Sequence, residues 1–514
     1  MRIPQPLGLI FPFLVLLGQG IAAEAPIVSI AALQAGLAAR LAATHAPGAS
    51  WGVEVISLES GKTLFATNAD RLFVPASNTK LFTGALALDQ LGPADRLNTR
   101  VLSMEKPAAD GTLAGDLWIR GEGDSLISGR ARGGGWKRGI EPVVAAIQAA
   151  GIKQVKGDLV ADVTRFRGPA YGNGWNWDDL SVSDAPPVSP LTFNNNCVRI
   201  TFAPGPAPGQ PATLRLDPPW VSSASAAGDP PLLTVTHRVI TGTTNQESQL
   251  TWEMPPGVAV MTVSGLVAFE GGSESAEVPV VDAAAYFARA VREGLAAAGV
   301  QVSGRIRVIG GYGSDPKSSS PPPGLQELAA IPSAPLSLRI RELMKPSDNL
   351  HAQLALLQVG ARQRSVPAST TEAAGLRAMD SFLAAVGLHR TEYFFEEGSG
   401  LSRKNAVTPH AVVNLLKFMA RHRAAKEWME SLPIGGVDGS LKTRFTALPT
   451  KGNVRAKTGS LRHVNALSGY VTSASGEPLA FSILVNQYVA EGSASSRREI
   501  DSLVELLANY AGPR

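Results

Sequence analysis

The sequence predicts an α+β protein in which one helix-and-sheet domain is divided into two parts by a long, strand-rich insertion. Three observations support this fold class. The chain has 514 residues, which exceeds the usual limit of a single hydrophobic core. Strand-like and helix-like runs occur towards both ends of the chain. Between about residue 96 and residue 310, short strand patterns alternate with Gly, Asp and Pro clusters. An antiparallel sheet that takes strands from both ends of the chain fits this order.

The first 25 residues have the features of a secretory signal peptide. Arg2 supplies the positive start, Leu7 to Leu17 the apolar segment, and Ala23-Glu24-Ala25 the small-residue cleavage site. No later stretch reaches the roughly 20 apolar residues that a membrane-spanning helix requires. The mature protein is therefore expected to be exported to the periplasm in soluble form. A loose association with the membrane or the wall stays open.

The divided domain is expected at residues 26–95 and 325–514. Its first part contains the strand patterns "WGVEVISLE" and "TLFATNAD", followed by an apolar helix after Ala76. Its second part contains four helical patterns, "PLSLRIRELM", "LHAQLALLQVGARQ", "TTEAAGLRAMDSFLAAVG" and "TPHAVVNLLKFMARH". Two strand-like runs follow, "NVRAKTGSLRHVNALSGYVTS" and "LAFSILVNQYV", and then a final helix, "SRREIDSLVELLANYA".

The insertion is expected at residues 96–324. Its strand patterns include "GTLAGDLWIRGEGD", "GIKQVKGDLVADVTRF" and "AVMTVSGLVAF". One helix, "DAAAYFARAVREGLAAAG", precedes a further strand, "RIRVIGG". The Gly-, Ser- and Pro-rich tract from Gly313 to Gly324 is interpreted as a linker that ends the insertion.

Composition excludes several classes of protein. A hydrophobic content of 44% and a charged content of 18% are typical of a globular chain. The net charge of +4 is small for this length, and no dense basic tract indicates nucleic-acid binding. The single Cys197 cannot form an intramolecular disulfide, and the seven scattered His residues show no metal-binding spacing. We therefore expect neither a metal nor any other cofactor. The oligomeric state is left open.

The stretch "PASNTKLFTGALALDQL" puts a serine and a lysine at the start of an apolar helix. Residues i and i+3 of a helix share a face, so Ser77 and Lys80 are expected to be neighbours. The pattern S-x-x-K occurs three times, and the copies at Ser103 and Ser314 lie in polar or loop-like sequence. A solvated serine and lysine is the alternative interpretation of any single copy. Only Ser77 opens an apolar helix, whose N-terminal N–H groups favour a developing anion.

A second informative stretch is "MKPSDNLHAQL". Pro346 ends the preceding helix, so Ser347-Asp348-Asn349 is expected on the turn between two helices. The alternative interpretation is a plain N-cap for the next helix, which any of these three residue types would serve.

The third stretch is Lys457-Thr458-Gly459 in "NVRAKTGSLRHV". The structural interpretation is an ordinary edge strand in which Gly459 marks a bulge. The functional interpretation uses the same glycine differently, because a strand without a side chain there lets the backbone of a ligand lie close.

Together, the three stretches provide the groups that acyl transfer needs. Ser77 is expected to be the nucleophile and Lys80 its base, since a serine hydroxyl attacks poorly until a base removes its proton. Burial and the second cation, Lys457, are expected to lower the pKa of Lys80. Ser347 is placed to relay a proton to the leaving amine, and Asn349 to hold Lys80 and the substrate amide.

The strand that carries Lys457 is expected to bind the substrate. Lys457 and Thr458, with the strand through Gly459 and Ser460, are expected to bind a terminal carboxylate. The backbone N–H groups of Ser77 and Ser460 are the natural donors to the oxyanion.

The ordered set S-x-x-K, S-D-N and K-T-G is similar to that of penicillin-binding proteins and class A β-lactamases. Class A β-lactamases have a far shorter interval between the first two motifs and a Glu-x-x-x-Asn loop, which is absent here between Ser347 and Lys457. The chain instead resembles, nearly end to end, the D-alanyl-D-alanine carboxypeptidase/endopeptidases, the class C type-4 low-molecular-mass penicillin-binding proteins of peptidase family S13. Further matching stretches are "IRGEGDSL", "APPVSPLTFNNN", "EGSGLSRKNAVTP" and "GGVDGSL".

The resemblance implies a penicillin-recognising α+β domain whose insertion forms one or two accessory domains. It implies that the enzyme removes terminal D-Ala from peptidoglycan stem peptides and hydrolyses D-Ala–diaminopimelate cross-links. It also implies that β-lactams are covalent inhibitors and that no cofactor is used. Asp162 and Arg403 match the positions that hold the diaminopimelate side chain in this family. Two departures are Glu397, where the family has Asp, and Arg462, an extra cation beside the cleft.

Two other functions remain as alternatives. One is a β-lactamase, which must hydrolyse its acyl-enzyme quickly. The other is a non-catalytic wall-binding or sensor protein that keeps the fold without the chemistry.

Overall fold

The structure is a computed structural model that describes residues 27–129, 134–225, 227–311, 320–363, 369–489 and 495–512. The expected signal peptide, residues 1–25, lies outside the described residues, as do residues 313–319 of the expected linker. Within the described part of the chain, no helix is both long enough and apolar enough to cross a membrane.

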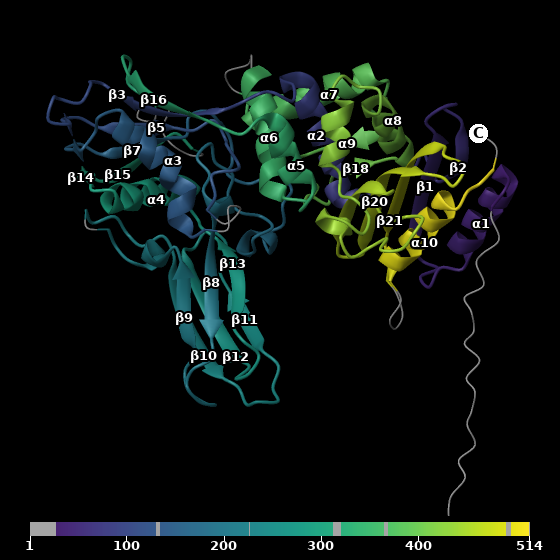
Figure 1. Cartoon of the computed structure of the whole chain (residues 1–514), viewed down its shortest axis with the longest axis horizontal. Coiled ribbons are helices and arrows are strands. Elements are labelled where there is room, and N and C mark those ends of the chain that lie inside the picture. The colour runs from purple at the N-terminus through teal and green to yellow at the C-terminus, as the bar shows by residue number, and fades with distance from the viewer. Residues whose placement is uncertain are drawn as a thin grey trace, which may run out of the picture.

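A five-stranded antiparallel sheet joins the two ends of the chain (Figure 1). Its central neighbours β21 and β1 come from opposite ends of the sequence, as the sequence predicts for an α+β domain. Along both strands nearly every residue is buried, because helices cover both faces of the sheet. In the order of the sheet, its strands are β19 (Arg455–Leu461), β20 (Val464–Thr472), β21 (Pro478–Asn486), β1 (Ser50–Ser57) and β2 (Thr63–Thr67).

Two hydrophobic cores hold the helices on this sheet. Helices α1 (Ile30–Ala42) and α10 (Ser496–Ala508) pack on one face, around Leu37, Phe481 and Leu507. A larger helical layer covers the other face, with Phe82, Leu356 and Trp428 in its core. The helices of that layer are α2 (Thr79–Leu91), α5 (Leu336–Met344), α6 (Asn349–Gln363), α7 (Thr371–Val386), α8 (Pro409–Met419) and α9 (Ala425–Ser431).

The insertion begins with a second five-stranded sheet. Strands β5, β7 and β15 run parallel, which requires crossover connections, and helices α3 (Trp136–Ala149) and α4 (Ala283–Ala297) lie in these connections. The strands of this sheet are β15 (Ile306–Ile309), β7 (Leu159–Asp162), β5 (Leu117–Arg120), β3 (Asn98–Ser103) and β16 (Gln326–Pro332). A small sheet beside it contains β14 (Gln301–Val302), β6 (Gln154–Val155) and β4 (Thr112–Leu113).

Strand β16 is the last element of the insertion. It pairs antiparallel with β3, so residues 326–332 belong to the sheet of the insertion. The expected boundary at residue 324 therefore lies before this strand rather than after it. The divided domain resumes at α5.

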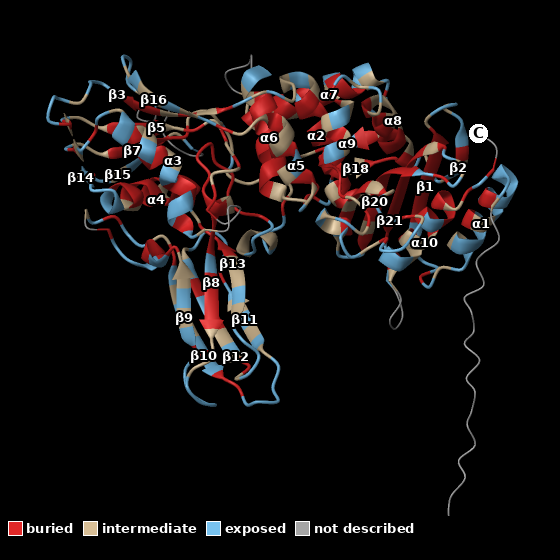
Figure 2. Cartoon of the chain, viewed as in Figure 1, coloured by how far each residue is buried: buried red, intermediate tan, exposed pale blue. Residues whose placement is uncertain are grey.

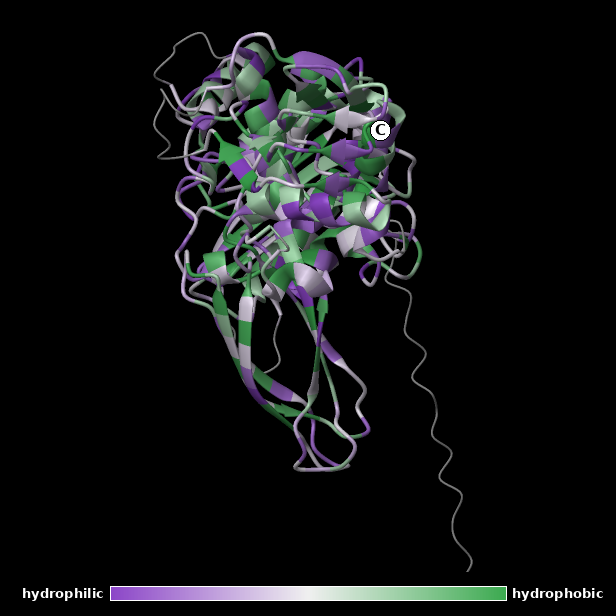
Figure 3. Ribbon diagram, turned by 90° about the vertical axis from the view of Figure 1, so that its left-hand side faces the viewer, coloured by the Kyte–Doolittle hydropathy of each residue, from purple (hydrophilic) through white to green (hydrophobic). Residues whose placement is uncertain are grey.

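The middle of the insertion projects as a separate lobe (Figure 1). Much of its surface is exposed or half-buried, unlike the sheet that joins the chain ends (Figure 2). Hydrophobic and hydrophilic segments alternate along its strands (Figure 3), as expected where one face of each sheet meets solvent. Its two three-stranded sheets are β13 (Glu274–Pro279), β8 (Cys197–Ala203) and β9 (Thr213–Asp217), and β10 (Thr234–Thr241), β12 (Val260–Val267) and β11 (Gln249–Glu253).

Candidate active site

Ser77 and Lys80 lie next to each other at the start of α2. A short 3-10 turn, Ala76–Asn78, leads into the helix, and Ala76 has a φ of 48°, a conformation that is rare for residues other than glycine. The Nζ of Lys80 donates to Ser77 Oγ at 2.8 Å, and the lysine side chain is completely buried. The geometry thus gives the serine a base within hydrogen-bond distance.

Lys80 is held by two further acceptors. Its Nζ lies 2.5 Å from Asn349 Oδ1 and 2.7 Å from the backbone oxygen of Ser399. Asn349 is the first residue of α6, and its side-chain amide donates to the backbone oxygen of Asp184 in the insertion at 2.9 Å. The second motif therefore lies between two helices, as the sequence predicts, and both the catalytic domain and the insertion orient it.

The second serine and the second lysine also form a pair. The Nζ of Lys457, on β19, donates to Ser347 Oγ at 2.7 Å and to the backbone oxygen of Thr458 at 2.9 Å. Ser347 has a φ of 68°, so the turn holds its backbone in a left-handed conformation that residues other than glycine rarely adopt. The three motifs of the sequence thus meet at one place: helix α2, the α5–α6 turn and the edge strand β19.

Gly459, the glycine of the third motif, lies against the turn that carries Ser77, whereas the functional interpretation of the sequence places the backbone of a ligand there. A Cβ at Gly459 would lie 2.7 Å from the backbone oxygen of Pro75 and 3.1 Å from Asn78 Nδ2. Asn78 Nδ2 also donates to the backbone oxygen of Lys457 at 3.2 Å. The missing side chain therefore lets β19 approach the turn that carries Ser77, whereas the sequence interpretation reserved that space for a ligand.

Thr458 and Ser460, which follow Lys457 in the chain, carry polar side chains along the edge strand β19. Thr458 is half-buried, and its Oγ1 lies 2.7 Å from Ser440 Oγ, while Ser460 is exposed. Ser440 belongs to the stretch "GGVDGSL" and is absent from the set of site residues inferred from sequence. Its position beside Thr458 was not predictable, because it depends on a contact between segments 18 residues apart.

Burial dominates the electrostatics of the two lysines. It lowers the pKa of Lys80 to about 8, although the carboxylates of Glu397, Asp348 and Asp184 oppose the shift. Burial and the charge of Lys80 together hold the pKa of Lys457 well below its usual range. The expected repulsion between the two lysines therefore lowers the pKa of Lys457.

Asp162 and Arg403 lie in different surroundings. Asp162 ends β7 with a completely buried side chain, and its oxygens accept from Arg120 Nε at 2.6 Å and from Thr164 Oγ1 at 2.6 Å. Arg403 is exposed, and it donates to the backbone oxygen of Arg462 at 3.1 Å. One acid of the insertion within the electrostatic reach of Arg403 is Asp179, whose pKa is raised by burial and lowered in part by this arginine.

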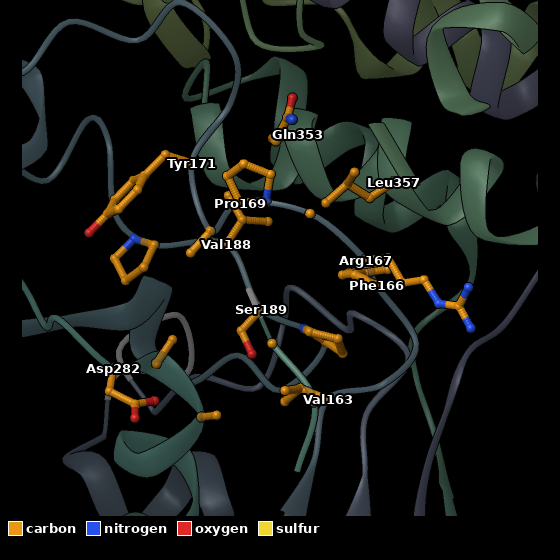
Figure 4. A pocket seen from close by; sticks show the side chains of 18 of the residues that line it. Val163, Phe166, Arg167, Pro169, Tyr171, Val188, Ser189, Asp282, Gln353 and Leu357 are labelled. Carbon is orange, nitrogen blue, oxygen red and sulfur yellow. The ribbon is translucent and has the colours of Figure 1, made fainter. Parts of the chain in front are cut away.

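Two cavities of about 380 Å³ border α6. One extends from Ser347 and Asn349 to Asp184 and Asn195 of the insertion, so it adjoins the catalytic groups. The other lies between the insertion and the catalytic helices and is lined by Tyr171 and Val188 of the insertion and by Gln353 and Leu357 of α6 (Figure 4). The first cavity is therefore the one of the two that is lined by residues of the second motif.

The fold and the site define a penicillin-recognising serine peptidase. Its marks are a buried lysine beside a serine at a helix start, a serine and an asparagine between two helices, and a second buried lysine on an edge strand. A family model described as "D-Ala-D-Ala carboxypeptidase 3 (S13) family" matches residues 33–510. The chain therefore belongs to the D-Ala-D-Ala carboxypeptidase 3 (S13) family, and it is a serine-type D-Ala-D-Ala carboxypeptidase.

Individual relatives agree with this assignment. The chain is 31% identical to a D-alanyl-D-alanine carboxypeptidase of an Actinomadura species over 476 residues, covering 90% of this chain and 82% of the relative. Its structure is similar to that of penicillin binding protein 4 from Haemophilus influenzae, with a TM-score of 0.74, 26% identity, and coverage of 94% and 99% of the two chains. The same protein complexed with a β-lactam matches with a TM-score of 0.70, 25% identity, and coverage of 92% and 98%.

Proposed function

We propose that the enzyme removes terminal D-Ala from peptidoglycan stem peptides and hydrolyses D-Ala–diaminopimelate cross-links, through an acyl-enzyme on Ser77. The observation that carries this proposal is the 2.8 Å contact between Lys80 Nζ and Ser77 Oγ. A lysine whose pKa is about 8 is neutral often enough near neutral pH to accept the serine proton.

In the acylation step, neutral Lys80 accepts the proton of Ser77, and Oγ attacks the carbonyl carbon of the penultimate D-Ala. The N–H groups of Ser77 and Ser460 stabilise the oxyanion that forms. The C–N bond then breaks, and the proton that Lys80 accepted passes through the hydroxyl of Ser347 to the leaving amine, so that Lys80 is neutral again. Lys457 contacts that hydroxyl at 2.7 Å. Terminal D-Ala leaves from a stem peptide, and the diaminopimelate amine leaves from a cross-link.

In the deacylation step, neutral Lys80 removes a proton from the water that attacks the ester carbonyl, and it returns this proton to Ser77 Oγ, which leaves as the alcohol. This favours cleavage over transpeptidation, because a transpeptidase must hold an amine acceptor and exclude water. An exported enzyme in the periplasm meets finished wall, where water is the abundant nucleophile.

Substrate recognition is divided between two groups of residues. The substrate carboxylate binds to Lys457 and Thr458 on β19, with Gly459 allowing the strand to lie beside the nucleophile. Arg403, which donates to the backbone oxygen of Arg462 just beyond β19, faces the diaminopimelate side chain. Asp162, the acid assigned from the family resemblance, and Asp179, the acid beside Arg403, are the two candidates for its amino group.

The test combines labelling with product analysis. Incubation with penicillin should acylate Ser77, which mass spectrometry of the tryptic peptide detects, and Ser77→Ala should remain unlabelled. The wild-type enzyme should also release D-Ala from a pentapeptide muropeptide and split a cross-linked dimer. Rapid turnover of the penicillin would identify a β-lactamase instead, and labelling without muropeptide cleavage would identify a non-catalytic sensor.

A further inference from the structure

The loop that holds the Ser399 carbonyl against Lys80 is itself built around one buried carboxylate. Glu397 is 1% exposed, and both of its oxygens accept several hydrogen bonds. Its partners are the N–H of Ser399 (2.6 Å), Ser399 Oγ (2.5 Å), Gly400 N–H (2.6 Å), Asn405 Nδ2 (2.9 Å), Trp175 Nε1 (3.2 Å) and Ser402 N–H (3.4 Å). Such a set of donors fixes the position of the carboxylate within the loop.

These hydrogen bonds curl the chain so that the Ser399 carbonyl faces Lys80. The next residue, Gly400, has a φ of 86°, and a Cβ there would lie 1.9 Å from the backbone oxygen of Ala76, so the loop packs directly on the nucleophile turn. Gly398 fixes the other end, because its N–H donates at 2.9 Å to Gln353 Oε1. The same Gln353 side chain lines the cavity of Figure 4.

The negative charge of Glu397 also raises the pKa of Lys80. Of the carboxylates that act on the lysine, Glu397 has the largest effect, followed by Asp348 and Asp184. Lys80 in turn repels Lys457 and so contributes to the lowered pKa of that lysine. Because its oxygens are occupied by donors of the protein, Glu397 is not placed to activate water.

We propose that Glu397 is a positioning residue of the acylation reaction, which holds the Ser399 carbonyl against Lys80 Nζ and supplies the buried negative charge that faces the Lys80 ammonium. The proposal rests on Lys80 being the base of the function proposed above. The insertion takes part, since the indole of Trp175 donates to the same carboxylate.

The proposal predicts the direction of a pH shift. The acylation rate should rise as Lys80 loses its proton, so its midpoint follows the pKa of about 8. Glu397→Gln removes the charge that favours the ammonium, so the pKa of Lys80 falls further and the midpoint moves to lower pH by about one unit. The plateau rate should fall about 10-fold, because an amide NH₂ then faces backbone donors.

The experiment measures the single-turnover rate of Ser77 acylation by a chromogenic penicillin between about pH 5.5 and 10. Glu397→Asp keeps the charge and should return the midpoint to within a few tenths of a unit of the wild type, even if its rate stays low. Glu396→Gln is the matched control. Glu396 is the adjacent residue and forms an ion pair with Lys404 at 3.3 Å, so its loss should leave the midpoint unchanged.

The outcomes separate this proposal from the function on which it rests. A wild-type enzyme that is not acylated at Ser77, or whose rate shows no pH dependence, refutes the proposed function. A wild-type enzyme with a normal profile, combined with variants that lose rate equally at every pH, refutes the role of Glu397. Should Glu397→Gln fail to fold, as judged by circular dichroism, a Glu397→Asp profile displaced by one unit would also contradict the proposal.

Discussion

The side-chain amide of Asn195, in the insertion, donates a hydrogen bond of 2.7 Å to the carboxylate of Asp348, in the second catalytic motif. The other oxygen of Asp348 accepts the N–H of His351 at 2.9 Å and so caps the first turn of α6. Asn195 has a φ of 54°, a left-handed conformation that asparagine tolerates better than most residues. The insertion thus holds the turn that carries Ser347 and Asn349.

We therefore expect Asn195→Ala to slow acylation of Ser77 by about 10-fold, since a hydrogen bond to a charged group contributes about 1.5–3 kcal/mol and part of it is regained through water. Stopped-flow acylation by penicillin measures this. Asn245, exposed in the projecting lobe, provides the matched control, and Asn245→Ala should acylate at the wild-type rate. Equal rates for the two variants would mean that the insertion does not support the motif.

Gly459 offers a second test of close packing at the site. An alanine Cβ there would lie 2.7 Å from the backbone oxygen of Pro75, so β19 must move away from the nucleophile turn. We expect Gly459→Ala to reduce acylation by about 100-fold while the melting temperature changes by only a few degrees, because a displacement of about 1 Å misaligns the reacting groups. Gly48→Ala is the control, because a Cβ at that glycine has no heavy atom within 4 Å. Acylation of Gly459→Ala at the wild-type rate would show that β19 accommodates the added methyl group without displacing the nucleophile turn.

Glu372 links the insertion to the catalytic helices, and its burial lowers the stability of the folded protein in a pH-dependent way. One of its oxygens accepts from Gln353 Nε2 at 2.6 Å and from the N–H of Asn173 at 3.1 Å. Burial raises its pKa from 4.5 to about 7. The unfolded chain therefore ionises this carboxyl first, and the folded protein loses stability as the pH rises from about 4.5 to about 7.

Replacing Glu372 by Gln keeps the accepting oxygen and removes the buried charge. Glu372→Gln should therefore be more stable than the wild type at pH 8, by up to about 3 kcal/mol, and closely similar to it below pH 4.5. Thermal unfolding at the two pH values measures the difference. Glu430→Gln makes the same charge change at an exposed position of α9 and should have little effect at either pH. A Glu372→Gln variant that is less stable than the wild type at pH 8 would show that the ionised Glu372 does not destabilise the folded protein.

The sequence predicted the elements that local patterns determine. The helix after Ala76, the turn at Ser347-Asp348-Asn349 and the strand at Lys457 are where the motifs place them, because capping residues, helix breakers and apolar spacing act over a few residues. Helix α3 was missed, since Gly139 and Pro142 interrupt its pattern. In the structure Gly139 packs against the backbone of Gly129, a contact that no local rule reveals.

The rest of the site depends on contacts between distant segments. Glu397 was noted in the sequence only as a departure from the family, whereas its role comes from donors that include Trp175 of the insertion. Asn195 and Ser440 likewise reach the site from loops whose sequences carry no catalytic pattern. The end of the insertion was placed too early, because the pairing of β16 with β3 spans more than 200 residues of sequence.

The two acids proposed for the diaminopimelate amine make different predictions. Asp162 is buried and paired with Arg120, whereas Asp179 is half-buried and lies within the electrostatic reach of Arg403. If the amine binds at Asp179, Asp179→Asn should raise the KM for a diaminopimelate-containing pentapeptide by about 10-fold, as should Arg403→Ala, since each removes one charged contact. Neither change should alter acylation by penicillin, which lacks that side chain.

Asp162→Asn separates the alternatives. If Asp162 is a structural partner of Arg120, its replacement should lower the melting temperature and leave the KM unchanged, because breaking a buried pair leaves an uncompensated charge. Steady-state release of D-Ala from matched lysine- and diaminopimelate-containing pentapeptides measures the KM of each variant. A KM that rises for Asp162→Asn only with the diaminopimelate peptide would show that the buried carboxylate becomes accessible to substrate, as the family resemblance implies. A KM that rises only for Asp179→Asn would assign the amine to Asp179, the acid within the electrostatic reach of Arg403.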